Sequence, residues 1–209
     1  LSTINSYFYM VLKFKEGSKV VYPSHGVGII NGIETNEVVG MVIKTYVIQF
    51  DKEKMVLRIP VGRAEKSGLR PLSTTSELDK VGKILLERPK TSRGMWSRRA
   101  KEYESKINSG NIVFVAEVVR DLHKNVDDPE RSYSERIIYE NALERLASEV
   151  SAIKKIDIEG AQNYLVNNLN TKNPYFVRKA ALAAAKKAEE DALEAGESDE
   201  YEDDEAMAA

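Results

Sequence analysis

The sequence predicts an α+β protein with two domains, a small five-stranded β-barrel followed by a compact all-helical domain. Two observations carry this prediction. Up to Leu72 the apolar residues form short, β-branched runs separated by glycine and turn residues, a pattern typical of antiparallel strands. Beyond Leu72 they recur every three to four residues, as on one face of an α-helix. The 209 residues, 42% of them apolar, suffice to build two small hydrophobic cores.

Five short strands are expected in the first domain, because turn residues divide its apolar runs. The Pro-Ser-His-Gly segment at 23–26 forms a turn, residues 51–54 close a hairpin, and Pro60 ends the fourth strand. Five antiparallel strands within residues 14–72 favour a Tudor-like or SH3-like barrel, since curling limits the number of exposed strand edges. The expected strands cover residues 19–22, 28–34, 38–50, 55–60 and 69–72.

Five helices are expected in the second domain, and capping residues mark where several of them begin. Residues 74–77 and 132–135 fit the capping-box pattern, and Asp157 is suited to cap the fifth helix. Pro89 stops the first helix. The expected helices cover residues 74–88, 95–109, 112–124, 132–150 and 157–169. A last, alanine-rich helix starts at Pro174 and runs into an acidic tail whose composition predicts disorder.

These patterns divide the chain into four parts. Residues 1–13 are predicted to be an N-terminal extension, 14–72 the β domain, 73–170 the helical domain, and 171–209 the alanine-rich helix with its acidic tail. Because residues 1–9 precede a methionine, Met10, they are expected to lie upstream of the fold.

Composition and motif searches exclude several classes of protein. The chain has no cysteine, which rules out disulfide scaffolds, thiol nucleophiles and cysteine-ligated metals and favours the cytoplasm. Its apolar runs fall far short of the ~20 residues that a membrane span needs. His25 and His123 lie in different predicted domains without a partnered acid. Gly26 and Gly28 precede a strand rather than the helix that a phosphate loop needs. We therefore expect no catalytic residue, metal or cofactor.

The net charge of −2 conceals an uneven distribution. Residues 189–205 hold eleven acidic residues and no lysine or arginine, which leaves 31 basic against 22 acidic residues, a net charge of +9, in the rest of the chain. A body of that sign indicates a polyanionic partner. The acidic tail either competes with nucleic acid for this body or only keeps the protein soluble, and both interpretations stay open.

A basic segment around the only tryptophan is the candidate nucleic-acid site. Residues 83–106 carry a net charge of +5 around Trp96. Basic side chains neutralise phosphates, and a large apolar side chain can wedge against a base step. The alternative is that Trp96 heads a core stripe, because Tyr103 and Ile107 follow it at helical spacing. The candidate DNA-binding residues are Lys90, Arg93, Trp96, Arg98, Arg99 and Lys101.

A long apolar strand in the first domain is the candidate protein-binding surface. Residues 41–50 hold more apolar side chains than one buried face requires, which suggests a protein-binding face or a sheet edge that accepts a partner strand. Val38 and Met41 lie near the expected turn, with Arg58 on the adjoining strand. The alternative is that these residues only cap the end of the barrel.

Three motifs resemble those of the CarD/CdnL family of bacterial transcription regulators. The first is the Tyr-Pro-Ser-His-Gly segment at 22–26, with its flanking residues 14–21 and 33–35. The others are Trp-Ser-Arg-Arg at 96–99 and Ala-Glu-Val-Val-Arg-Asp-Leu at 116–122. The first motif also marks the RNA polymerase-interacting domain of transcription-repair coupling factors, but the other two motifs fit CarD/CdnL, and the chain has no helicase P-loop. The resemblance extends over residues 14–169.

The resemblance implies that the Tudor-like domain binds the β subunit of RNA polymerase. The family's polymerase contacts map to Thr35, Asn36, Val38 and Arg58, and some members carry arginine where Asn36 stands. With Met41 added from the strand pattern, the candidate polymerase-binding residues are Thr35, Asn36, Val38, Met41 and Arg58.

The resemblance also implies that the helical domain reaches promoter DNA at the upstream edge of the transcription bubble. There the family's tryptophan, here Trp96, wedges into the minor groove without recognising sequence, and Arg98 and Arg99 match its DNA-facing arginines. The implied function is a transcription regulator that stabilises the open promoter complex, notably at ribosomal RNA promoters. We expect a monomer in the cytoplasm, brought to the nucleoid by RNA polymerase.

Two other functions are compatible with the sequence, and one further protein partner is expected. An architectural nucleic-acid-binding protein that acts without polymerase is the main alternative, and a hydrolase with an unrecognised site is a third. The terminal Ala208-Ala209 resembles C-terminal degrons read by bacterial AAA+ proteases, which adds such a protease to the expected partners.

Overall fold

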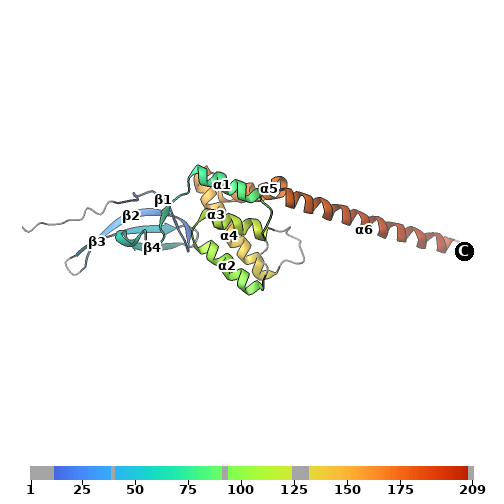
Figure 1. Ribbon diagram of the computed structural model, residues 1–209, viewed down its shortest axis with the longest axis horizontal. Helices are drawn as coiled ribbons and strands as arrows, with labels where there is room; N and C mark the ends of the chain where they lie inside the picture. Colours follow the sequence, from blue (N-terminus) through green and yellow to red (C-terminus); the bar gives the residue numbers. More distant parts are fainter. Residues whose placement is uncertain (1–11, 39–40, 91–93, 124–131, 207–209) are drawn as a thin grey trace, which may run out of the picture.

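Within the residues that it describes, 12–38, 41–90, 94–123 and 132–206, the computed structural model has a five-stranded antiparallel sheet followed by six helices (Figure 1). The strands are β1 Lys19–Tyr22, β2 Gly26–Val38, β3 Met41–Phe50, β4 Met55–Pro60 and β5 Arg70–Pro71. The helices are α1 Thr75–Leu86, α2 Trp96–Asn108, α3 Ile112–Leu122, α4 Tyr133–Lys154, α5 Ile158–Lys172 and α6 Pro174–Ala206. The predicted α+β layout is confirmed.

The sheet is open and does not close into the predicted barrel. Its strands follow the order β4-β3-β2-β1-β5, and no pairing among the described strands joins β4 to β5. Closure would need a longer β5, but this strand has two residues and follows a 3-10 helix at Val61–Arg63. The Tudor-like barrel is therefore not confirmed, and β4 is an edge strand. The core of the sheet domain consists of Phe14, Val20, Ile30, Tyr46, Ile48, Phe50, Ile59, Ala64 and Leu69.

The helical domain packs around α3, in which seven of eleven residues are buried. Helix starts follow the local signals in the sequence. Thr74 and Glu77 form the predicted capping box of α1, and Ser132 accepts a hydrogen bond from the Glu135 backbone at the start of α4. Asp157 precedes α5 as predicted, but its side chain makes no capping hydrogen bond.

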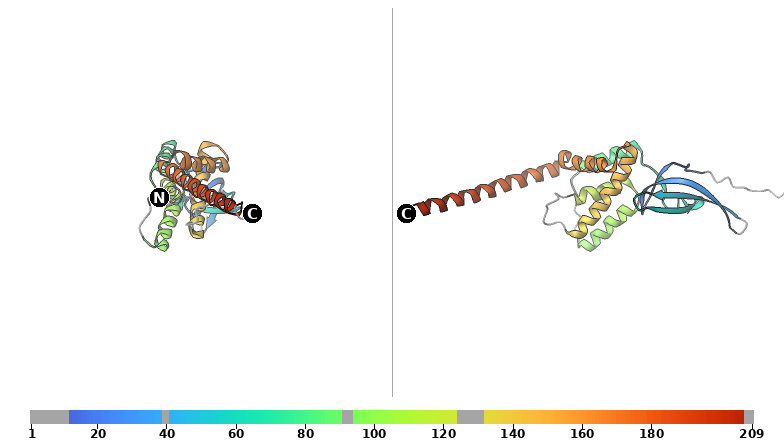
Figure 2. Two further views of the ribbon diagram at one scale, coloured as in Figure 1. Left: turned by 90° about the vertical axis from the view of Figure 1, so that its right-hand side faces the viewer. Right: turned by 180° about the vertical axis from the view of Figure 1, so that it is seen from behind.

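Helix α6 differs from the predicted disordered tail, because it continues as one helix through the acidic segment to Ala206. Its start is tied to the end of α1: Asn173 Nδ2 donates to the carbonyl oxygens of Leu85, at 2.7 Å, and of Glu87, at 2.9 Å. From there α6 projects away from the body (Figures 1 and 2). The alanine run at 180–185 favours helix through intrinsic propensity and so needs little packing. Residues 1–9 and Ala208-Ala209, for which we made predictions above, lie outside the described residues.

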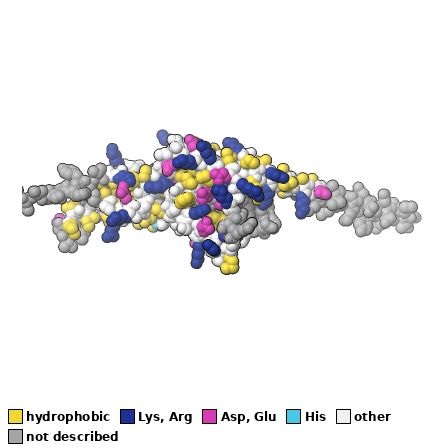
Figure 3. Space-filling view, viewed as in Figure 1, with side chains coloured by type: hydrophobic (Ala, Val, Ile, Leu, Met, Phe, Trp, Pro, Cys, Tyr) yellow, Lys and Arg dark blue, Asp and Glu magenta, His cyan; other side chains and the backbone are white. Residues whose placement is uncertain are grey.

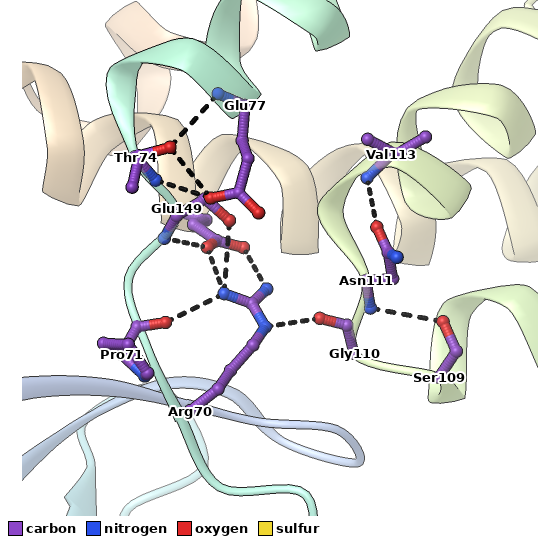
Figure 4. A network of polar contacts seen from close by, with 10 residues as sticks. Arg70, Pro71, Thr74, Glu77, Ser109, Gly110, Asn111, Val113 and Glu149 are labelled. Carbon is purple, nitrogen blue, oxygen red and sulfur yellow. Dashed lines mark hydrogen bonds and ion pairs between the residues drawn. The ribbon is translucent and has the colours of Figure 1, made fainter. Parts of the chain in front are cut away.

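A buried carboxylate joins the two domains. Arg70, in β5, donates through Nη1 and Nη2 to the Glu149 carboxylate of α4, at 2.7 and 2.8 Å (Figure 4). The Ser73 backbone N–H donates to the same carboxylate at 2.9 Å, and Arg70 Nε donates to the Gly110 carbonyl oxygen at 2.7 Å. The Glu149 side chain is 6% exposed, so these charge-assisted bonds form out of water. The Glu149 carboxylate thus holds the sheet, the turn into α1 and helix α4 in one arrangement.

A second contact between the two domains involves the turn at residues 23–26. Arg145 of α4 donates to the carbonyl oxygens of Pro23 and Ser24, both at 2.5 Å. Burial lowers the pKa of Arg145, while the charges of Glu53 and Glu144 act in the opposite direction. Gly110 packs against the same turn at a φ of +71°, and a Cβ there would lie 3.1 Å from Pro23 Cγ. The Tyr-Pro-Ser-His-Gly motif therefore contacts the helical domain directly.

We expect Glu149→Gln to destabilise the protein by about 3 kcal/mol, because Arg70 then loses the charge that balances it in a partly buried place. Urea unfolding measures the change. Glu144→Gln, on the same helix, is the matched control: its ion pair with Lys52 is more exposed, and its loss should cost less than about 1 kcal/mol. Equal losses in the two variants would show that the buried pair does not hold the domains together.

Candidate functional site

The N-terminal ends of α2 and α4 lie side by side at the end of the helical domain remote from the sheet (Figures 1 and 2). Trp96 begins α2, and its indole Nε1 donates to Ser134 Oγ in the first turn of α4, at 2.9 Å. We call the group of Met95, Trp96, Tyr133 and Ser134 the α2–α4 tip. The indole is thus held by both helices.

Trp96 lies at the boundary between core and surface. It is half-buried and packs against the helical core, with its ring centroid 6.4 Å from that of Tyr103. Tyr103 and Ile107 are buried, as the predicted core stripe requires. Arg99 covers the indole, its guanidinium carbon 5.3 Å from the ring centroid, in a cation–π contact. Trp96 therefore packs against the core while the residue keeps partial exposure to solvent.

Basic side chains surround the tip. On the face shown in Figure 3, lysine and arginine side chains stand beside hydrophobic ones at the lower end of the helical domain. Arg98 and Lys101 are exposed, and Arg99 is half-buried. Among the described residues, helix α2 has neither a side-chain cap nor an acidic residue in its first turn, so the positive end of its dipole is not neutralised there. Arg93, a predicted DNA contact, lies outside the described residues.

Lys90, the remaining predicted DNA contact, is held by a buried ion pair from α3. Its backbone N–H donates to Asp121 Oδ1 at 2.9 Å, while its side chain is exposed. Arg120, 1% exposed, donates to Asp121 at 2.8 Å and to Glu87 at 2.9 Å. Burial raises the pKa of Asp121, and the hydrogen bonds from Lys90 and Arg120 act in the opposite direction. The motif at 116–122 thus anchors the segment between α1 and α2.

Four of the predicted polymerase contacts lie on the β2–β3 hairpin, and the fifth, Arg58, lies on the adjoining strand β4. The register pairs Asn36 with Ile43, and Arg58 with Val47. Because side chains alternate along a strand, Asn36, Met41 and Arg58 share the outer face of the sheet, whereas Thr35, which pairs with Lys44, has the opposite orientation. Val38 ends β2, and its backbone pairs with Met41.

Apolar side chains near the end of this hairpin are exposed. Met41 is 65% and Val42 is 62% exposed, so these two side chains do not cover the core. Arg58 makes a two-pronged ion pair with Glu34 on the same outer face, at 3.1 and 3.3 Å. The hydrogen bond and the charge of Glu34 raise the pKa of Arg58. The Arg58 side chain is thus paired with Glu34 at the surface of the sheet.

Both histidine side chains contact neighbouring side chains in the structure. His25 stacks on Tyr22 with centroids 5.7 Å apart, and its Nδ1 lies 2.6 Å from the Glu53 carboxylate. His123 is buried, with its ring nitrogens 2.9 Å from Tyr139 Oη and 2.8 Å from Asn170 Oδ1. In the described part of the chain, no group of three or more acidic or histidine side chains is arranged to hold a metal ion. No described helix is both long and apolar enough to cross a membrane.

No signal in the sequence indicates the α4 half of the tip. The capping box at 132–135 fixed where α4 begins, but nothing local indicates that Ser134 meets Trp96, 38 positions away. The same holds for Arg70 and Glu149, which are separated by 79 positions. Only a tertiary structure brings these residues together.

Comparison with known proteins places the chain in a family. A model of the CarD C-terminal domain matches residues 80–166, and a model of the CarD-like/TRCF RID domain matches residues 14–73. The chain is also 34% identical over 143 residues to the protein named "Putative transcription factor YdeB" of Bacillus subtilis (strain 168). That alignment covers 68% of this chain and 94% of the relative.

We expect Ser134→Ala to loosen the indole, which makes the emission of the only tryptophan a direct reporter of the tip. Loss of the Nε1 hydrogen bond should shift the emission to longer wavelength and cost about 1 kcal/mol of unfolding free energy. Fluorescence spectra and urea unfolding measure both effects. Ser105→Ala, at an exposed position of α2, is the matched control. An unchanged emission spectrum in Ser134→Ala would contradict the assigned hydrogen bond.

Proposed function

The chain belongs to the CarD family of transcription regulators, and from this premise we propose that it binds the β subunit of RNA polymerase and stabilises the open promoter complex. In this proposal the β2–β3 hairpin and the edge of the sheet contact polymerase, while the α2–α4 tip contacts DNA at the upstream edge of the transcription bubble. The protein performs no catalysis of its own.

The fixed, half-exposed indole of Trp96 is the observation that carries the proposal. A side chain that unstacks a base step must keep its orientation while it displaces the neighbouring base. Trp96 is restrained on three sides: by Ser134 at its Nε1, by Arg99 over its ring, and by the core behind it. Since the ring is already ordered, little conformational entropy is lost when DNA binds.

The charges at the tip favour a contact that reads shape rather than sequence. Arg98, Arg99 and Lys101 suit phosphate groups, which are the same for every sequence. Such a contact is weak and sensitive to salt when it acts alone. Tethering to polymerase raises the effective concentration of the tip near the promoter, and we expect binding to free DNA to be poor.

The arrangement of the two domains supports separate roles, with polymerase binding in the sheet domain and DNA binding in the helical domain. The hairpin and the tip lie at opposite ends of the body (Figure 1), and the contacts of Glu149 and Arg145 hold the domains in one orientation. A rigid body of this kind presents its DNA contact at a fixed place once the hairpin is bound.

The sheet domain offers two features suited to a protein partner. The outer edge of β4 is unpaired among the described strands, so it is available for a strand of the partner. Val56 on β4 is exposed, like Met41 and Val42 on β3. Val56 and Arg58 share the outer face of β4 and give this edge an apolar side chain and a charge, while Met41 adds an exposed apolar side chain at the hairpin end of β3.

We expect Trp96→Ala to shorten the half-life of the open complex by about tenfold, since unstacking at a base step involves a few kcal/mol. The measurement uses polymerase from the same source on a ribosomal RNA promoter, with and without the protein. Binding to polymerase alone should be unchanged in this variant.

The same experiment separates the proposal from a polymerase-independent DNA-binding protein. A stand-alone binder that contacts ~5 phosphates should bind free duplex with a log–log salt slope near −4.5. Tight duplex binding with that slope, and no effect on the open complex, would contradict our proposal.

We expect Arg58→Glu to weaken binding to polymerase by about tenfold, through loss of a charge that the partner recognises. The double variant Glu34→Arg/Arg58→Glu rebuilds the ion pair with its charges exchanged. If polymerase recognises Arg58 itself, this swap does not restore binding. Restored binding would mean that polymerase binding depends on the ion pair between residues 34 and 58 and not on the arginine at position 58. When the Arg58→Glu variant is added at a concentration that saturates polymerase, the half-life of the open complex should stay near the value measured with the unchanged protein.

A further inference from the structure

We propose that Tyr133 is a second aromatic DNA contact, which stacks on an unpaired base where the duplex opens. The inference rests on the proposed function and adds a site to it. Met95 and Tyr133, at 79% and 74%, are the two most exposed large hydrophobic side chains in the described part of the chain. Both belong to the α2–α4 tip: Met95 directly precedes Trp96 at the start of α2, and Tyr133 begins α4. Exposed apolar side chains gathered at one place mark a binding surface.

The position of Tyr133 follows from the contact between the two helices. Tyr133 begins α4 and directly precedes Ser134, whose Oγ accepts the hydrogen bond from Trp96. Tyr133 and Trp96 are therefore carried by two helix ends that are joined to each other. DNA that reaches one of the two rings is close to the other.

Among the described residues, the Tyr133 ring is not part of the helical core. Among the described residues its hydroxyl group has no hydrogen-bond partner, and the ring has no aromatic neighbour. Its one described contact is Arg136, whose guanidinium carbon lies 5.9 Å from the ring centroid. By contrast Tyr103 and Tyr139, in the same domain, are buried in the core.

The surrounding charges favour nucleic acid as the partner. Arg98 and Lys101 are exposed on α2, and Arg136 is exposed on α4, where it also forms a 3.5 Å ion pair with Glu140. Aromatic rings flanked by cations are the usual platform for unpaired bases, because every base has a face that can stack and a phosphate beside it. Bases within a duplex are covered by their neighbours, so the ring can stack only where the strands have separated.

This geometry assigns different tasks to the two aromatic side chains. Trp96 has its edge and one face occupied by Ser134 and Arg99, which leaves a fixed wedge for the duplex. Among the described residues only Arg136 makes a ring contact with Tyr133, so the ring suits a base that has left the stack. Together they would delay reannealing at the edge of the bubble.

The test measures the half-life of the open complex with the full-length protein. Tyr133→Ala should reduce the gain in half-life by about fivefold or more, the factor expected from the loss of one stacked base. Tyr133→Phe should retain the gain, because stacking does not need the hydroxyl group. Tyr133→Leu, which keeps an apolar helix-forming side chain without a ring, should behave like alanine.

Tyr164→Ala is the matched control. Tyr164 is also an exposed tyrosine beside a cation, with Lys154 Nζ 4.6 Å from its ring centroid, but it lies on α5. This variant should leave the half-life unchanged. A second measurement places 2-aminopurine at the upstream edge of the bubble, where stacking quenches its fluorescence. The quench should persist in Tyr133→Phe and disappear in Tyr133→Ala.

Each other outcome overturns the proposal in a distinguishable way. If Trp96→Ala shortens the half-life and Tyr133→Ala does not, the proposed function stands and only the role of Tyr133 is wrong. If Tyr133→Ala weakens binding to polymerase in the absence of DNA, the ring contacts protein. If Tyr133→Phe loses as much as Tyr133→Ala, the hydroxyl group acts and stacking does not. If the unchanged protein has no effect on the half-life, both proposals fail.

Discussion

The Glu149 carboxylate is the contact on which the arrangement of this molecule depends. It binds Arg70 at the end of the sheet and the Ser73 backbone at the entrance to α1, and Arg70 in turn reaches the carbonyl of Gly110 between α2 and α3. A charge this deeply buried is tolerated because both of its oxygens are satisfied by charge-assisted or backbone hydrogen bonds. Together with the contacts of Arg145 to the turn at 23–26, the Glu149 carboxylate joins two domains that the chain connects only through the few residues between β5 and α1. With this contact in place, a surface at the hairpin and a surface at the tip keep a constant separation.

The α2–α4 tip shows how one residue serves both stability and recognition. Trp96 lies where the core stripe of α2 reaches the surface, and the same packing that fixes its ring contributes to folding. Order of this kind lowers the entropic cost of binding, since the side chain is not immobilised again when a partner arrives. The two interpretations of Trp96 that the sequence allowed, core residue and DNA contact, are therefore compatible. Periodicity identifies the buried side of such a residue, whereas its exposed side is visible only in three dimensions.

Local features of the fold could be predicted from the sequence, and long-range ones could not. The capping box at Thr74, the N-cap at Ser132 and the limits of β1 and β4 depend on neighbouring residues, and the structure has them where the patterns indicated. Barrel closure depends on a pairing between distant strands, and a two-residue β5 does not provide it. The acidic composition of the tail suggested disorder, but the alanine run before it has a strong preference for helix. Arg70, Arg145 and Glu149 gave no signal at all, because charged residues on predicted helices and strands are normally solvated.

In the proposed complex with promoter DNA, helix α6 also determines which charges the nucleic acid would meet. The acidic residues begin fifteen positions after Pro174, which corresponds to about 20 Å along a straight helix axis. The Debye length at physiological ionic strength is about 8 Å, so charges at that separation are largely screened from the body. A rigid arm of this kind lets one chain be acidic as a whole and yet basic where it approaches a phosphate backbone. Its isoelectric point consequently says little about its affinity for a polyanion, and a shortened or softened arm would change that affinity without altering any residue of the contact surface.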